Sequence, residues 1–115
     1  MAIIPSIFNW LNNKRIDQIE LFKKYPEETQ KEVLHGLLSK AAGTEWGIKH
    51  GFSSISTIRE FQNRIRIQNY ESLLPFVERL RNGEVNLLWP GEIKWFAKSS
   101  GTTSAKSKFI PVSRE

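Results

Sequence analysis

Hydrophobic residues recur at helical spacing along most of the chain, and two short apolar runs follow near its C-terminal end. Over residues 5–24 this spacing predicts one helix with a break or two short helices, because two asparagines weaken the middle. A second helix is predicted to begin at Pro26, a residue that suits a first turn, and to end at Gly43. Its apolar stripe comprises Val33, Leu34, Leu37, Leu38, Ala41 and Ala42.

Shorter elements are predicted in the middle of the chain. Residues 43–52 contain three glycines, which indicates a loop, and Trp46 and Phe52 are expected to hold this loop to the core. Thr57 and Glu60 stand three residues apart, as a capping box requires, so a short amphipathic helix should start there.

An extended stretch and one more helix complete the helical part. "RIRIQ", residues 64–68, alternates cations with isoleucines, which is typical of extended chain. A helix is expected over residues 71–81, with Pro75 in an early turn and Asn82-Gly83 at its end.

Two strands are predicted to flank a polar loop near the end of the chain. A turn at Pro90-Gly91 precedes the first strand, residues 93–97, and the second covers residues 109–112. The predicted fold class is therefore α+β: a mainly helical segment with a strand-loop-strand unit at its C-terminal end.

This pattern divides a single segment, residues 1–115, into a helical part, residues 1–90, and a hairpin, residues 91–115. The length suits one domain, and the 39% of hydrophobic residues is within the globular range. Four tryptophans lie in apolar contexts and are expected in the core.

Several classes of site and location are disfavoured by composition. The chain has no cysteine, and its two histidines lie far apart without carboxylates at ligand spacing, so no metal site is predicted. The apolar start precedes its basic residues, the reverse of a secretory signal, and is too short to span a membrane. We expect a cytoplasmic protein without a membrane partner.

Net charge is +5, and from Lys94 to Arg114 there are five cations and no acid. Such a stretch is either a solvated basic surface or a site for an anion. A small basic module that contacts nucleic acid is one alternative for the whole chain.

The loop between the strands has the chemistry of a phosphate site. Serine, threonine and glycine at consecutive positions let N–H groups and hydroxyls converge on one anion, and a lysine adds charge. The Walker A pattern does not fit, because Ser100 and Ala105 stand where its two glycines belong. From composition alone, a plain surface hairpin loop is the commoner interpretation.

A more specific resemblance lies in residues 99–104, "SSGTTS", followed by Lys108 and Pro111. This stretch resembles the phosphate-loop signature of adenylate-forming enzymes, and more narrowly the Gretchen Hagen family of auxin-responsive acyl-acid amido synthetases, with the pattern S-S-G-T-[ST]-G-x-x-P-K-x-x-P. Ser104 replaces the last glycine of this pattern and Ser107 its first proline. Upstream, "GTEWGIKHGF", "RIRIQNYESLLPFVERLRNGE" and "LLWPGEIKWFAKSSGTT" resemble the same family in the same order.

The resemblance implies a two-step reaction. A carboxylic acid attacks the α-phosphate of ATP to give an acyl adenylate and pyrophosphate, and an amine, typically that of an amino acid, then takes the acyl group. In that family the loop holds the triphosphate and Mg²⁺ shares its charge. Lys108 would then supply the catalytic cation, and the phosphate-binding residues would be Ser99, Ser100, Gly101, Thr102, Thr103 and Ser104.

The resemblance also implies that the chain is the N-terminal segment of a larger α/β adenylate-forming enzyme. In the family the adenine pocket, the acyl pocket and the acidic Mg²⁺ motif all lie further along the chain. We therefore expect the segment alone to be inactive and nucleic acid not to be a partner.

Overall fold

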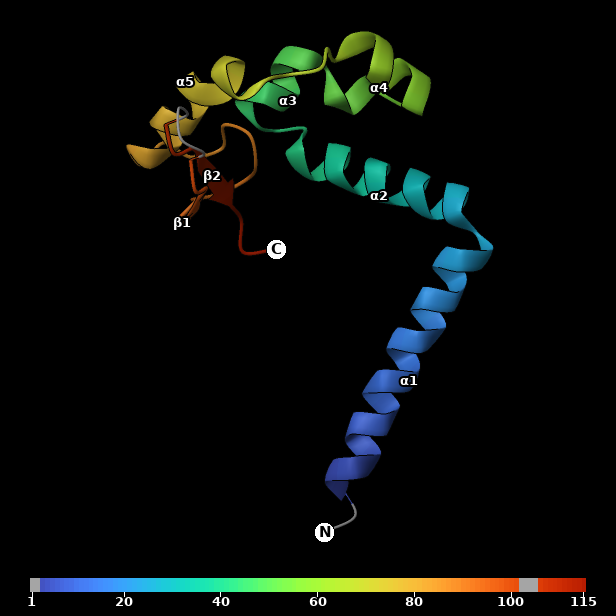
Figure 1. Ribbon diagram of the computed structural model, residues 1–115. Helices are drawn as coiled ribbons and strands as arrows, with labels where there is room; N and C mark the ends of the chain where they lie inside the picture. Colours follow the sequence, from blue (N-terminus) through green and yellow to red (C-terminus); the bar gives the residue numbers. More distant parts are fainter. Residues whose placement is uncertain (1–2, 102–105) are drawn as a thin grey trace. The chain divides into compact units, whose positions relative to one another are not determined.

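The computed structural model describes residues 3–101 and 106–115. The chain divides into two compact units, Met1–Leu34 and His35–Glu115. Helices predominate, and the two strands form one antiparallel pair near the C-terminal end, so the predicted α+β class is confirmed (Figure 1).

Helix α1, Ile3–Lys24, is continuous. The expected weak point at Asn12 and Asn13 does not break it, because each asparagine costs a helix only a few tenths of a kcal/mol, about 0.7 at most. The next helix follows after Tyr25 alone, whose carbonyl oxygen accepts bonds from the backbone N–H (3.1 Å) and the hydroxyl (2.8 Å) of Thr29.

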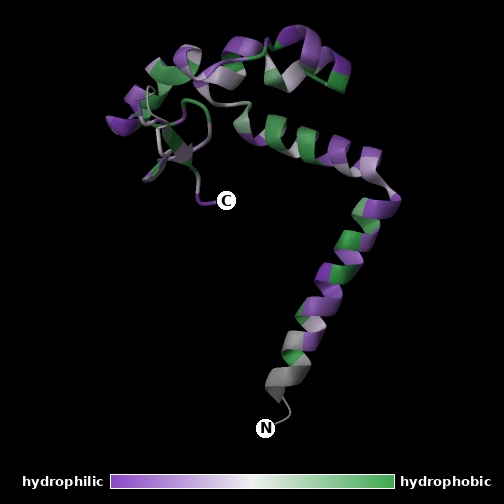
Figure 2. Cartoon of the chain, viewed as in Figure 1, coloured by the Kyte–Doolittle hydropathy of each residue, from purple (hydrophilic) through white to green (hydrophobic). Residues whose placement is uncertain are grey.

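Apolar side chains of α1 are exposed within the first unit. Hydrophobic and hydrophilic residues alternate along this helix (Figure 2), and Trp10 is 57% exposed. The expectation that every tryptophan lies in the core is therefore wrong for Trp10, because the described residues of its unit leave it uncovered. In the described part of the chain, no helix is both long and apolar enough to cross a membrane.

Helix α2, Pro26–Ala41, begins at the predicted residue, with Glu27 and Glu28 in its first turn, and ends two residues before Gly43. Only part of its apolar stripe is buried: Leu38 and Ala41 are in the core, whereas Val33 is exposed.

The predicted loop at residues 43–52 is instead largely helical. Helix α3, Glu45–His50, occupies most of it, and a 3₁₀ turn, η1, Phe52–Ser54, begins at its last residue. Thr44, which is 1% exposed, caps α3 by accepting a hydrogen bond from the Gly47 N–H (3.0 Å). Gly51 ends the helix in the left-handed region, at φ 63°. The glycines therefore serve a helix end and a close contact rather than a coil.

Helix α4, Ile58–Arg64, has the predicted capping box. The Thr57 hydroxyl accepts from the Glu60 N–H (3.1 Å), and the Glu60 carboxylate accepts from the Thr57 N–H (3.2 Å) and the Ser56 N–H (2.7 Å). The chain turns extended at Ile65, close to the predicted position.

Helix α5, Tyr70–Arg81, starts one residue before the predicted range. The Asn69 side chain caps it by accepting from the Ser72 N–H (2.9 Å), and Pro75 is tolerated in the second turn. Gly83, at φ 91°, lies just beyond the helix end. Both elements of the predicted stop, Asn82 and Gly83, are thus confirmed.

The core of the second unit is centred on Leu80, Leu87 and Ile93. Half-buried side chains pack against these three; they are Phe76, Leu88, Trp89 and Phe96. Asn86 closes the turn at Gly91, because its side-chain oxygen accepts from the Gly91 N–H (2.7 Å).

Strands β1, Trp95–Lys98, and β2, Phe109–Val112, pair antiparallel, with Trp95 opposite Val112 and Lys98 opposite Phe109. The second strand has its predicted bounds. The first begins later than expected, because Ile93 serves as a core residue ahead of it. Trp95 is 74% exposed, so it too departs from the expected core.

Arg79 joins three segments of this unit. Its guanidinium donates to both carboxylate oxygens of Glu45 (2.9 and 2.7 Å) and to Glu84 (2.9 and 2.7 Å). The hydrogen bond from Arg79 lowers the pKa of Glu45, and the two carboxylates raise the pKa of Arg79. Backbone bonds from Glu45 N–H to Asn86 C=O and from Trp46 N–H to Leu87 C=O, both 2.9 Å, support the same contact.

Gly47→Ala should destabilise the purified chain by about 1–3 kcal/mol, the usual cost of overpacking. A Cβ at Gly47 would collide with the backbone carbonyl of Ala41, which cannot move without shifting α2. Gly36→Ala is the matched control: it lies inside α2 with nothing within 4 Å of a new Cβ, so it should stabilise the chain by roughly 0.5–1 kcal/mol. Urea unfolding of both variants measures the difference. Equal effects would contradict the close approach at Gly47.

The cap of α4 predicts a pH dependence. Bonds from the Ser56 and Thr57 N–H groups lower the pKa of Glu60 below its usual 4.5. The cap's contribution to stability is then complete above about pH 4.5 and is lost as the pH falls through the folded-state pKa. Glu60→Gln keeps a capping side chain but cannot ionise, so urea unfolding at about pH 5 and pH 3 should show a smaller loss for the variant. The same loss in both proteins would show that the cap is not linked to this titration.

Candidate functional site

The two limbs of the polar loop meet at Ser99 and Lys108, just beyond the paired strands. The Ser99 backbone N–H donates to the Lys108 carbonyl oxygen (2.9 Å), and the Lys108 N–H donates to the Ser99 hydroxyl oxygen (3.0 Å). The Ser99 side chain thus takes the place of a second carbonyl and closes the base of the loop. Two of the residues singled out in the sequence are therefore in direct contact.

Other predicted phosphate-binding residues follow Ser99 along the first limb. Ser99 is half-buried, whereas Ser100 and Gly101 are exposed. The remaining three, Thr102, Thr103 and Ser104, lie outside the described residues, and their role stays a prediction. Because the backbone N–H of Ser99 is already bonded, its hydroxyl proton is the donor it can offer to a ligand.

Beyond the loop base, the strands expose backbone groups at an outer edge. In an antiparallel pair, positions that exchange hydrogen bonds alternate with positions that do not. Ser99 and Lys108 form a bonded position, so the adjacent pair, Lys98 and Phe109, is a non-bonded one. The N–H and C=O of Phe109 consequently point away from β1.

Tyr70, at the start of α5, satisfies both of these groups. Its hydroxyl oxygen accepts from the Phe109 N–H and donates to the Phe109 carbonyl, each at 3.0 Å. The same alternation explains why β2 tolerates Pro111: its partner is Phe96, again at a non-bonded position, so no ladder hydrogen bond is lost.

Three cations gather around the rings of Tyr70 and Phe109. The Arg81 guanidinium carbon lies 3.9 Å from the centroid of the Phe109 ring, and Lys98 Nζ lies 5.9 Å from it. Lys108 Nζ lies 5.3 Å from the centroid of the Tyr70 ring. Within residues 3–101 and 106–115, none of these three cations forms an ion pair with a carboxylate. Their charge is therefore available to an anion.

Sequence reasoning missed Tyr70 and Arg81. Both belong to α5, far from the loop in sequence, and only the packing of α5 against β2 brings them to it. Tyr70 could have been noticed as an aromatic residue with a hydroxyl at the start of a predicted helix, but no sequence spacing linked it to Phe109.

Hydroxyl donors, a glycine and unneutralised cations at one loop base suit an oxygen-rich anion such as phosphate. Among the residues that the structure describes, no three His, Cys, Asp or Glu side chains lie close enough to hold a metal ion. The donor set therefore fits the phosphates of a nucleotide but offers no carboxylate cluster for Mg²⁺.

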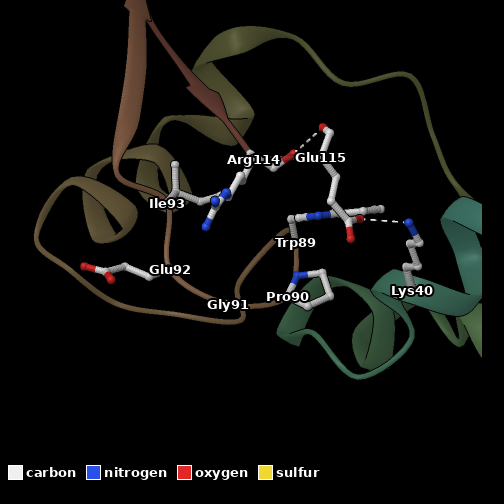
Figure 3. Close-up of a pocket in the computed structure, with 9 residues that line it drawn as sticks. Lys40, Trp89, Pro90, Gly91, Glu92, Ile93, Arg114 and Glu115 are labelled. Atoms are coloured by element: carbon white, nitrogen blue, oxygen red, sulfur yellow. Dashed lines mark hydrogen bonds and ion pairs between the residues drawn. The ribbon is translucent and has the colours of Figure 1, made fainter. Parts of the chain in front are cut away.

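A separate pocket of about 660 Å³ lies beside the Pro90-Gly91 turn (Figure 3). Its wall includes Trp89, and an exposed ion pair from Lys40 Nζ to Glu115 Oε2 (2.8 Å) lies at its side. None of the described loop residues lines this pocket, so it is treated separately from the candidate phosphate site.

Comparison with protein families matches residues 15–115 to the GH3 family N-terminal domain. The chain is 31% identical over 101 residues to the jasmonoyl-L-amino acid synthetase JAR4 of Nicotiana attenuata, covering 87% of this chain and 18% of that protein. It is 29% identical over 100 residues to the probable indole-3-acetic acid-amido synthetase GH3.2 of Oryza sativa subsp. japonica, covering 86% of this chain and 16% of that protein.

A third relative is the indole-3-acetic acid-amido synthetase GH3.2 of Arabidopsis thaliana. It is 27% identical over 103 residues, which cover 89% of this chain and 19% of that protein. The chain therefore spans less than a fifth of the length of these relatives.

Proposed function

This chain belongs to the GH3 family, and on that premise we propose that it is the N-terminal part of an ATP-dependent acyl-acid amido synthetase. In this proposal the full-length enzyme joins a small carboxylic acid to an amino acid or another amine, and the described segment contributes the phosphate-binding loop. Support comes from the names of the relatives, which are amido synthetases for jasmonate or indole-3-acetic acid.

The single observation that carries the role of the loop is the contact between Ser99 and Lys108. It places the first donors of the limb beginning at Ser99 next to the ammonium-bearing residue of the returning limb. A triphosphate bound between the limbs would meet hydroxyl and N–H donors on one side and Lys108 on the other. Arg81 and Lys98 would add longer-range attraction from the base of the hairpin.

The proposed chemistry has two steps. The carboxylate oxygen of the acid attacks the α-phosphorus of ATP, the bond from that phosphorus to the bridging oxygen breaks, and pyrophosphate leaves with the electron pair. An amine then attacks the acyl carbon, loses a proton, and releases AMP. Negative charge on the leaving pyrophosphate grows in the first step, and donors already fixed in place stabilise it.

Each predicted site residue then has a proposed role. Lys108 is proposed as the catalytic cation for the leaving group, Ser99 and Ser100 as hydroxyl donors, and Gly101 as the point of close backbone approach. Thr102, Thr103 and Ser104 are proposed to continue this cradle. Mg²⁺ would accompany the phosphates of ATP and partly neutralise their charge. Among the described residues there is no cluster of three His, Cys, Asp or Glu side chains to hold it.

The alternative of a small nucleic-acid-binding module is less well supported. The exposure of Trp10 and Trp95 removes one argument against it. Membership of the GH3 family nevertheless favours the enzyme, because the relatives named above are synthetases. We propose that the reaction takes place in the cytoplasm and that the 115-residue segment alone is inactive.

Lys108→Ala in the full-length enzyme should slow acid-dependent ATP–pyrophosphate exchange by about 10² to 10³, the loss expected for one fixed transition-state donor. Lys106→Ala is the matched control: it removes a cation of the same type from the same loop, and both side chains are exposed, but Lys108 is held over the Tyr70 ring whereas Lys106 has no contact of this kind with the described residues. A solvated charge contributes mainly screened attraction, so the control should lose far less. If Lys106→Ala is the more damaging change, the roles of the two lysines are wrongly assigned.

A further inference from the structure

We propose that Tyr70 is the positioning residue of the phosphate loop, acting through Phe109 on Lys108. This inference rests on the function proposed for the loop. Tyr70 lies outside the loop motif, residues 99–111, and its role is assigned by the contacts of its hydroxyl and its ring.

Among the described residues, Tyr70 is the side chain that bonds to the backbone at the outer edge of the returning limb. A two-stranded sheet is marginal by itself, and of the described strands only β1 pairs with β2. At Phe109, one residue after Lys108, both backbone groups face the open edge, and the Tyr70 hydroxyl bonds to both. A hydroxyl both donates and accepts, so one atom can replace a missing third strand at this position.

Tyr70 is itself well fixed. It is the first residue of α5, whose start is capped by Asn69 and whose inner face includes the buried residues Val77 and Leu80. The position of the Tyr70 hydroxyl relative to the core is therefore set by a helix rather than by a loop. The two hydrogen bonds between the Tyr70 hydroxyl and Phe109 in turn fix the adjacent backbone of Lys108.

The ring of Tyr70 has a second effect. The Lys108 ammonium lies 5.3 Å from its centroid, within the range of a cation–π contact. An aromatic face attracts the ammonium without neutralising it, whereas a carboxylate would compete with phosphate for the same charge. The contact thus keeps Lys108 near the loop base with its charge available.

Tyr70→Phe in the full-length enzyme tests the hydroxyl alone, because the ring remains. Tyr25→Phe is the matched control, since Tyr25 is exposed and its hydroxyl makes no hydrogen bond to the residues described. Two readouts are needed: hydrogen–deuterium exchange at the Phe109 amide, and the kcat and KM for MgATP in acid-dependent pyrophosphate exchange.

We expect Tyr70→Phe to speed exchange at the Phe109 amide and to reduce kcat/KM for MgATP by about 10- to 10²-fold, the cost typical of a misplaced catalytic group. The KM for the acid should not change, and Tyr25→Phe should change neither readout. In a Lys108→Ala background, Tyr70→Phe should cost much less, because a residue that acts through Lys108 cannot act when it is absent.

Other outcomes overturn the inference in distinguishable ways. An active wild type whose Tyr70→Phe variant keeps its kcat/KM refutes the positioning role, even if the amide exchanges faster. Full additivity with Lys108→Ala also refutes it and indicates a purely structural contact. A full-length wild type without any acid-dependent exchange, tested with jasmonate and indole-3-acetate, refutes the proposed function and the positioning role with it.

Discussion

Phe109 presents an N–H and a C=O to an open sheet edge, and the Tyr70 hydroxyl that satisfies both is the contact on which the geometry of the loop depends. Without it, two backbone groups beside Lys108 would bond only to water, and β2 would be held by β1 and by side-chain packing. The contact joins a helix that belongs to the core to the strand that follows Lys108, the proposed catalytic cation.

Helix α5 can serve as this support because it is held on more than one side. Leu80 packs in the core with Leu87 and Ile93, the residue that leads into β1. On another side Arg79 binds Glu45 of α3 and Glu84 after α5, with two hydrogen bonds to each carboxylate. Although each exposed ion pair contributes little by itself, a bidentate network gives α5 a defined orientation.

Local signals allowed much of the fold to be predicted. The capping box of Thr57 and Glu60 appears as expected, because such a cap depends only on residues three apart. The glycines of residues 43–52 were misinterpreted, since a glycine that ends a helix and one that forms a loop look alike in sequence. Trp10 and Trp95 were expected in the core, yet burial depends on what lies opposite them, which no local pattern records.

The candidate site could be predicted only for the residues that belong to the loop motif of the family. Ser99 and Lys108 were identified because both belong to one motif, and their contact follows from the hairpin between them. Tyr70 and Arg81 could not be found in this way, because they reach the loop through the packing of α5 on β2.

The most direct test of this account is a crystal structure of the full-length protein with Mg²⁺ and a non-hydrolysable ATP analogue. The account predicts phosphate oxygens bonded to residues 99–101, Lys108 Nζ within about 4 Å of a phosphate oxygen, and the Tyr70 hydroxyl still bonded to Phe109. Phosphates bound away from this loop, with the Lys108 ammonium still over the Tyr70 ring, would contradict it.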